Sequence, residues 1–464
     1  MTSDAAANAA APEAAAPDHA APAHTAAAHR EAVRYLNDPR SIRARSEQLF
    51  ERLARGDSAH LVYHPEELAR AAAWVAQVTR ESYPTLDIPY HARANHFLAG
   101  PASSRAAGSR GDSAKPDTSQ SGPDISGMAR FARLFEALSS DEGRPEEIRA
   151  ERARGEFDLT LTSVLLDAGA GPDWSYVEPH TSDSYARSEG LAVASLHWFA
   201  SGAFSSHPKT PLRADASALR ALTREALEAG FQVSRANPLV GVEGRLGLLH
   251  ELGAALEAHP ELFPGGRAGS LFDVLSARAT QGVLRAEQIL EALLSGLSSI
   301  WPGREELGGV NLGDVWRHSA LAGCSPAPGL IPFHKLSQWL SYSLVVPLER
   351  AGVRVIELDT LTGLPEYRNG GLFLDTGVLS LRDPTQSERP QQPGGELIIE
   401  WRAATIALID RLAPLVRAEL GVSAEDLPLP RVLEGGTWAA GRRLAAKLRG
   451  GLPPLSLASD GTVF

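Results

Sequence analysis

The chain has 464 residues, of which 43% are hydrophobic and 22% are charged, a composition typical of a globular protein. Its formal net charge of −11 argues against a general nucleic-acid binder, which would normally display a basic surface. The single cysteine, Cys324, excludes an intramolecular disulfide framework and a thiolate-cluster metal site. We therefore expect a small-molecule substrate, no nucleic-acid partner and no cofactor, and the sequence leaves homo-oligomerisation open.

The amino terminus and the apolar runs bear on localisation. Acidic residues and prolines interrupt the first twenty positions, where a secretory signal would need a basic segment followed by an apolar core. No run approaches the eighteen or so apolar residues that a membrane span requires. These features predict a cytoplasmic protein with no membrane partner.

Two low-complexity stretches interrupt the chain. Residues 1–29 are rich in alanine and proline, and we expect a disordered tail because such a tract buries too little apolar surface to fold. Residues 100–127 are dominated by Ser, Gly, Asp and Pro, with helical patterning on both sides. We therefore expect one α-rich catalytic domain over residues 30–464, with a disordered insertion at about 100–127.

Apolar residues recur three and four positions apart along most of the chain, which predicts amphipathic helices. One stripe is formed by Leu246, Leu249, Leu252 and Leu256. In chain order, helices are expected over residues 41–53, 65–79, 182–201, 216–229, 243–258, 281–298, 335–351, 396–419 and 437–448.

Strand signals are few. The β-branched run at residues 353–358 predicts a short strand, and residues 371–381 read as a β-hairpin with its turn near Asp375 and Gly377. The expected fold class is mainly α with a small β-hairpin element.

Familiar catalytic signatures such as the Gly-x-Ser-x-Gly elbow, the P-loop and the His-Glu-x-x-His zinc helix do not occur in the sequence. Candidate site residues come instead from dense polar segments within apolar sequence. In the segment GGVNLGDVWRH, Asp314 is either a carboxylate facing a ligand or the cap of a short helix, a position that Asp favours.

Three further segments offer polar side chains. His334 and Lys335 stand at the entry of the helix expected from residue 335, where His334, Gln338 and Tyr342 share a face that is either a ligand surface or simply solvated. Glu366 and Arg368 lie in LPEYRNGG, which is either a functional loop or a surface turn. Finally, Gly436 and Thr437 open a helix, where N–H groups would suit a phosphate, although Thr437 also fits an ordinary N-cap.

These segments carry a resemblance to a known family. FPGGRAGSLFDVL, LGGVNLGDVWRH, IPFHKLSQWLSYSL, LTGLPEYRNGGLFLD, VLEGGTWAAGR and the terminal SDGTVF resemble the fourth protein of the URC uracil-catabolism pathway, from about residue 30 to residue 464. The resemblance implies a role in a uracil-degrading route in which the ring is opened and a ribosylurea-type intermediate releases urea.

A more distant resemblance concerns the chemistry. The segment NPLVGVEGRLGLLHELG, the segment RAEQIL and the segment ELIIEWRAATIA are similar, in the same order, to segments of queuosine-salvage N-glycosidases. This likeness implies a helical fold similar to helix-hairpin-helix glycosylases. It places Arg285 where those enzymes carry a functional lysine and matches Gln288 and Arg402 to their motifs. Phe333 stands where they carry the catalytic aspartate, so the carboxylate must come from elsewhere.

Together the resemblances predict a hydrolase that cleaves the N-glycosidic bond of a ribosylurea-type compound, either free or 5′-phosphorylated. Asp314 or Glu366 would supply the carboxylate, and His334 would protonate the leaving group. Arg285 and Lys335 would hold a 5′-phosphate. Two alternatives remain open at this stage, namely a non-catalytic protein that binds a uridine-derived ligand and an amidohydrolase that attacks the ureido group.

Overall fold

The computed structural model describes residues 20–100, 130–135, 144–301 and 305–458. Most of these residues lie in helices, as the sequence predicted. The helices are α1 (Ala20–Leu36), α2 (Pro39–Ala54), α3 (Leu68–Ser82), α4 (Arg93–Phe97), α7 (Pro145–Leu165), α8 (Arg187–Ala200), α9 (Ala216–Ala221), α10 (Arg224–Gly230), α11 (Val242–Ala258), α12 (Leu271–Arg278), α13 (Ala286–Leu297), α14 (Lys335–Arg350), α15 (Tyr367–Asp375), α16 (Glu396–Leu420), α17 (Leu429–Val432) and α18 (Trp438–Arg449).

The strands are two or three residues long and pair two by two. The β4–β9 pair is parallel and the others are antiparallel. The pairs are β1 (Leu61–Tyr63) with β10 (Leu379–Leu381), β2 (Ser175–Val177) with β3 (Ser184–Ala186), β4 (Val283–Arg285) with β9 (Arg354–Ile356), β5 (Glu306–Leu307) with β6 (Val310–Asn311), and β7 (Val315–Arg317) with β8 (Leu330–Pro332). The expected fold class, mainly α with small β elements, is confirmed.

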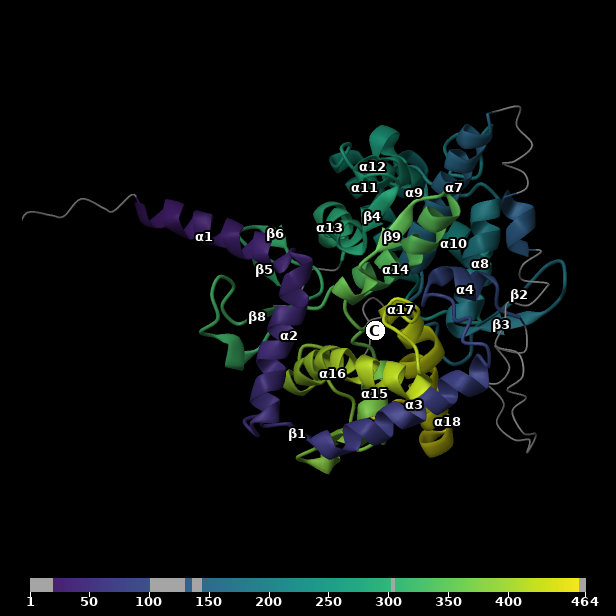
Figure 1. Cartoon of the computed structure of the whole chain (residues 1–464). Coiled ribbons are helices and arrows are strands. Elements are labelled where there is room, and N and C mark those ends of the chain that lie inside the picture. The colour runs from purple at the N-terminus through teal and green to yellow at the C-terminus, as the bar shows by residue number, and fades with distance from the viewer. Residues whose placement is uncertain (1–19, 101–129, 136–143, 302–304, 459–464) are drawn as a thin grey trace, which may run out of the picture.

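The N-terminal and C-terminal parts of the described chain fold together. Helix α16 packs against both α2 and α3, and α18 packs against α15 and α3 (Figure 1). The middle of the chain builds around α7, α11 and α14, and one continuous apolar core joins these helices to α16. Helix α16 is buried along most of its length and ends at Leu420, and the next residue, Gly421, caps it with a left-handed φ of 73°. In the described ranges, no helix is both long and apolar enough to cross a membrane.

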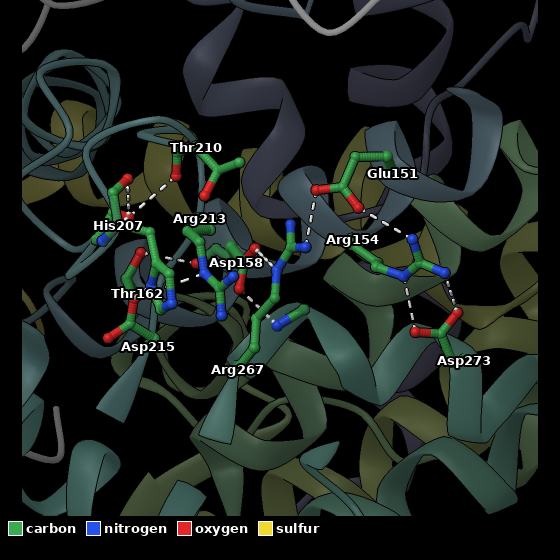
Figure 2. Close-up of polar contacts among 12 residues, drawn as sticks. Glu151, Arg154, Asp158, Thr162, His207, Thr210, Arg213, Asp215, Arg267 and Asp273 are labelled. Atoms are coloured by element: carbon green, nitrogen blue, oxygen red, sulfur yellow. Dashed lines mark hydrogen bonds and ion pairs between the residues drawn. The ribbon is translucent and has the colours of Figure 1, made fainter. Parts of the chain in front are cut away.

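An ion-pair network anchors helix α7 (Figure 2). The buried Asp158 accepts hydrogen bonds from the Arg267 guanidinium at 2.8 Å and from the Gly269 N–H at 2.5 Å. One turn earlier, Arg154 pairs with Asp273 of α12 at 2.7 Å. Because these pairs fix the position of α7, they also fix the residues that follow its C-terminal end.

Two expectations are corrected by the structure. Residues 20–29 belong to α1, whereas the tail was expected to extend to residue 29. The segment 371–381 is not a hairpin, because α15 continues to Asp375 and β10 pairs with β1. Gly377, the glycine expected in the turn, does have a left-handed φ of 79°, but it follows the end of α15 and does not join two paired strands. The expected disorder of residues 1–19 and 101–127 lies outside the described residues.

Candidate active site

The β7–β8 hairpin places Asp314 beside the first turn of α14. Its Oδ1 accepts hydrogen bonds from the Trp316 indole at 2.6 Å and from Arg402 at 2.9 Å. Its Oδ2 accepts from the Lys335 backbone N–H at 3.0 Å and from Arg402 at 2.8 Å. The guanidinium of Arg402 also lies 4.1 Å from the ring centre of Phe333. This buried ion pair therefore joins the middle of α16 to the start of α14.

The hydrogen bonds of Asp314 favour a structural role over a catalytic one. Both oxygens already accept two hydrogen bonds each, so little capacity remains for a reacting group. The bond to the Lys335 N–H caps the first turn of α14, which agrees with the helix-cap alternative. Asp314 is thus a positioning residue for Lys335.

The pKa of Asp314 predicts an acid-dependent loss of stability. Burial alone would raise this pKa, but Arg402 and the hydrogen bonds lower it from 3.8 to about 2. A depressed carboxyl pKa stabilises the folded state above pH 3.8, and the contribution is lost as the pH falls toward 2. We expect the free-energy difference between wild type and Asp314→Asn to shrink by about 2 kcal/mol over that range. Guanidinium unfolding at several pH values measures it, and a pH-independent difference would contradict the assignment.

Lys335 is half-buried at the start of α14, among acidic side chains of other elements. Burial lowers the pKa of its ammonium, although the nearby carboxylates of Glu366 and Asp167 act in the opposite direction. Glu366 is the N-cap of α15, where its oxygens accept from the backbone N–H groups of Arg368 at 2.8 Å and Asn369 at 2.6 Å. The structure therefore brings two of the predicted site residues, Lys335 and Glu366, into one electrostatic environment.

Trp339 lies one turn after Lys335 and so on the same face of α14. Its ring centre is 5.8 Å from that of His96, which belongs to α4. The Nδ1 of His96 lies 3.2 Å from an Arg93 guanidinium nitrogen and 3.3 Å from Ser188 Oγ. Because arginine can only donate, Nδ1 must accept, and burial and Arg93 both lower the pKa of His96. A neutral His96 therefore carries its proton on Nε2.

His91 and Trp438 continue this arrangement on the other side of Trp339. The His91 ring centre is 6.4 Å from that of Trp339 and 5.8 Å from that of Trp438, the first residue of α18. Its Nδ1 lies 2.6 Å from a carboxylate oxygen of Glu434. An acidic side chain and two indoles thus surround this imidazole.

Further contacts lead from Trp438 back to His96, so that the contacts form a closed ring of residues. The Arg442 guanidinium lies 5.3 Å from the Trp438 ring centre and 3.3 Å from a Glu189 oxygen. The preceding residue, Ser188, donates to Asp167 at 2.6 Å and lies next to His96. We call these eight residues the site cluster: His91, His96, Asp167, Ser188, Glu189, Trp339, Trp438 and Arg442.

Two buried donors next to this cluster have no acceptor among the described residues. They are the indole N–H of Trp339 and one terminal nitrogen of Arg93. The Arg93 side chain itself is held by Ser163 at 2.8 Å and by Asp167 at 3.0 Å. Buried donors are satisfied in the great majority of folded proteins, so these two suggest that a polar ligand or ordered water binds here.

A close helix crossing positions the neighbouring arginines. A Cβ at Gly441 of α18 would overlap the Arg368 carbonyl oxygen of α15. We expect Gly441→Ala to lower the free energy of unfolding by about 1–3 kcal/mol, because the helices must separate. Gly247→Ala in α11 is the matched control, since its Cβ meets nothing within 4 Å, and it should instead stabilise by up to about 1 kcal/mol. Equal effects of the two substitutions on guanidinium unfolding would argue against this crossing.

Two predicted site residues, His334 just before α14 and Gln338 within it, make structural contacts. His334 is buried, its Nε2 lies 3.0 Å from the Leu36 carbonyl oxygen, and burial lowers the pKa of its imidazole. This environment disfavours the protonated form that a general acid needs. Gln338 exchanges hydrogen bonds with Thr362, which fixes α14 against the segment before α15.

The predicted phosphate-binding residues are placed elsewhere. Arg285 is exposed, pairs with Glu357 at 2.8 Å, and forms with Gln288 a capping arrangement at the start of α13. Gly436 and Thr437 lie within a π-helical turn, Leu433–Thr437, that continues from α17 into α18. In this part of the described chain the helix continues without a free N-terminus, which removes the exposed N–H groups expected there, and phosphate binding by these two residues stays a prediction.

Sequence reasoning missed most of the site cluster, and the available signal was weak. His91 and His96 lie in the polar segment YHARANHF, and Ser188 and Glu189 precede an apolar helix. Each segment is unremarkable alone, and only the packing of distant elements joins them.

A surface pocket of about 690 Å³ lies apart from this cluster, lined by residues that include Leu374, Pro384 and Pro454. Its charged residues, Asp375 and Arg449, pair with each other.

The structure is thus a mainly helical protein in which α4, α8, α14 and α18 converge on a polar and aromatic cluster. The model of the family described as "Protein of unknown function (DUF1688)" matches residues 35–119 and 123–464. The chain therefore belongs to the DUF1688 family. Protein urg3 of Schizosaccharomyces pombe is 36% identical over 440 residues, which cover 94% of this chain and 99% of that protein. Uracil catabolism protein 4 of Lachancea kluyveri is 36% identical over 466 residues, covering 93% and 99%.

Proposed function

We propose that this chain acts in pyrimidine catabolism, and specifically in uracil degradation, as a hydrolase that cleaves an N-glycosidic bond of a ribosylurea-type compound and releases urea. The name of the Lachancea kluyveri relative supports the pathway. The observation that carries the reaction class is the half-buried Lys335, whose lowered pKa reflects burial and whose ammonium interacts electrostatically with the carboxylates of Glu366 and Asp167. Perturbed titratable groups that are gathered in one place are typical of catalytic sites.

The reaction needs a carboxylate and a proton donor. As the bond between the ribosyl C1′ and the ureido nitrogen breaks, its electron pair moves to nitrogen and positive charge develops on the sugar. The Glu366 carboxylate would stabilise that charge and accept the proton of the attacking water. The Lys335 ammonium would protonate the departing nitrogen, and its lowered pKa makes it a stronger acid. The products would be urea and the free sugar.

The site cluster would bind the ureido group. The Nε2–H of His96 can donate to a carbonyl oxygen, as can the donors of Trp339 and Arg93 that have no acceptor among the described residues. A planar urea can also stack on an indole, as polar planar groups do on aromatic faces. Donors that bind this oxygen more tightly as urea departs would lower the reaction barrier.

Incubation of the purified chain with ribosylurea and with its 5′-phosphate tests the proposal, with urea, ammonia and free sugar measured separately. We expect urea and sugar in equal amounts and no ammonia. Release of ammonia instead would indicate an amidohydrolase. Ligand-induced thermal stabilisation without any product would indicate a protein that only binds the compound.

A further inference from the structure

Arg245 of α11 is a fully buried arginine, and among the described residues its guanidinium pairs with no carboxylate. Its Nε donates to the Leu166 carbonyl oxygen at 3.0 Å, and one terminal nitrogen donates to those of Ala168 at 2.7 Å and Gly169 at 3.2 Å. The other terminal nitrogen donates to the Val240 carbonyl oxygen. A buried charge is costly, and only a guanidinium offers a rigid fork of donors that can bind several carbonyl groups at once.

The segment that Arg245 binds follows the end of α7. Leu166 is the C-cap of that helix, where the last carbonyl groups carry partial negative charge that a cation offsets. The same segment lies directly against the residues before α11. The Val240 N–H donates to the Ala170 carbonyl oxygen at 3.2 Å, and a Cβ at Gly171 would lie 2.7 Å from the Val240 side chain. Arg245 therefore fastens this segment to the start of α11.

Asp167 lies between two of the carbonyl groups that Arg245 binds. Its carboxylate lies 3.0 Å from the Arg93 guanidinium and accepts a hydrogen bond from Ser188 at 2.6 Å. Arg93 in turn lies 3.2 Å from the Nδ1 of His96, the contact that leaves the proton of a neutral His96 on Nε2. A continuous series of contacts thus runs from Arg245 to the ring of His96.

We propose that Arg245 is a positioning residue for the site cluster, because it fixes the backbone on either side of Asp167. The fixed carboxylate holds Arg93, and Arg93 sets the tautomer in which His96 donates through Nε2. The inference deepens the proposed function, on which it rests, because this N–H is one of the donors assigned to the ureido oxygen. Arg245 itself binds backbone and acts on the reaction only through Asp167.

Nitrogen-15 magnetic resonance of the histidine rings tests this series of contacts on the free full-length protein, without turnover. A His96→Gln variant identifies the signals of that ring. In the wild type we expect the ¹⁵N shifts of an Nε2–H tautomer at His96, and in Arg245→Lys the intermediate shifts of two exchanging tautomers. The reason is that the single nitrogen of a lysine cannot span the carbonyl groups on both sides of Asp167. With a ribosylurea-type substrate, kcat of Arg245→Lys should fall about tenfold, the effect of one well-formed hydrogen bond, with KM within about twofold of wild type.

Arg45→Lys is the matched control. Arg45 of α2 is also fully buried and donates to backbone carbonyl oxygens, those of Cys324 at 2.8 Å and Ala327 at 3.2 Å, which do not belong to the site cluster. This variant should lower the Tm about as much as Arg245→Lys does. It should nevertheless keep the Nε2–H tautomer of His96 and the wild-type kcat.

Two more variants complete the test. Arg245→Gln introduces no buried charge, which provides a folded protein if the lysine variant unfolds, and Asp167→Asn removes the carboxylate that holds Arg93. Both should show the exchanging tautomers of His96. If the tautomer stays fixed in the Arg245 variants, as in Arg45→Lys, or is unchanged in Asp167→Asn, the positioning role is wrong. If the ring signals change as expected but the wild type releases no urea from any substrate, the positioning role stands and the proposed hydrolysis fails.

Discussion

An Asp314→Ala variant should lose about 3–5 kcal/mol of unfolding free energy, the largest stability effect that we expect from one substitution. Asp314 is 6% exposed, and its removal leaves the Arg402 guanidinium buried without its carboxylate partner. The indole of Trp316 and the N–H of Lys335 lose the same acceptor. Guanidinium chloride unfolding followed by circular dichroism measures the difference.

Arg317→Gln provides the control from the adjoining strand. Arg317 pairs with Glu305 at 2.8 Å, but its side chain is 60% exposed. Exposed pairs contribute little, so we expect a change below about 1 kcal/mol. If Asp314→Ala and Arg317→Gln cost similar amounts, the Asp314–Arg402 pair would not be the link between α14 and α16 that the structure indicates.

Lys335→Met and Glu366→Gln should each lower turnover of a ribosylurea-type substrate by about 10²–10³-fold. The first removes the proton donor and the second removes the negative charge that would stabilise the sugar cation. Both variants keep a side chain of similar length, and a glutamine oxygen can still accept one of the N–H groups that Glu366 caps. Steady-state rates, with circular dichroism to verify folding, provide the measurement.

The Arg285→Gln variant distinguishes the site around Lys335 and Glu366 from the position that the resemblance to queuosine-salvage N-glycosidases implies. Arg285 lies on the surface at the start of α13, so its replacement should leave turnover within about twofold of wild type. Full activity of both Lys335→Met and Glu366→Gln would remove these two residues from the chemistry. A large loss in Arg285→Gln alone would instead favour the position that the glycosidase likeness indicated.

Much of the fold could be predicted from periodicity and capping. The expected helices at 243–258, 335–351 and 396–419 correspond to α11, α14 and α16 within one residue at either end. Helix α7 was missed because its first half is polar and its second half is buried on most sides, which gives no single apolar stripe. The hairpin expected at 371–381 was wrong because α15 continues to Asp375 and the strand after Gly377, β10, pairs with the distant β1. The likeness to helix-hairpin-helix glycosylases stays a prediction.

The candidate site was less predictable because its members are far apart in sequence. Lys335, Glu366 and Arg368 were found as polar residues within apolar segments, and they do lie near the site cluster. His91 and Glu434 are separated by 343 positions, and no local pattern joins them. Asp314 and His334 were predicted as a carboxylate and a proton donor of the site, yet their hydrogen bonds indicate that they support α14. The sequence cannot distinguish a reacting group from its support.

Nuclear magnetic resonance of a ribosylurea 5′-phosphate labelled with ¹³C and ¹⁵N in the ureido group tests the central claim most directly. With stoichiometric protein, the ureido ¹³C signal should become that of free urea, still coupled to both nitrogens. The Lys335→Met variant should leave the substrate signal unchanged over the same time. A product that retains the sugar–nitrogen bond and has lost one ureido nitrogen would contradict the N-glycosidase proposal, as would an unchanged substrate with the wild-type protein.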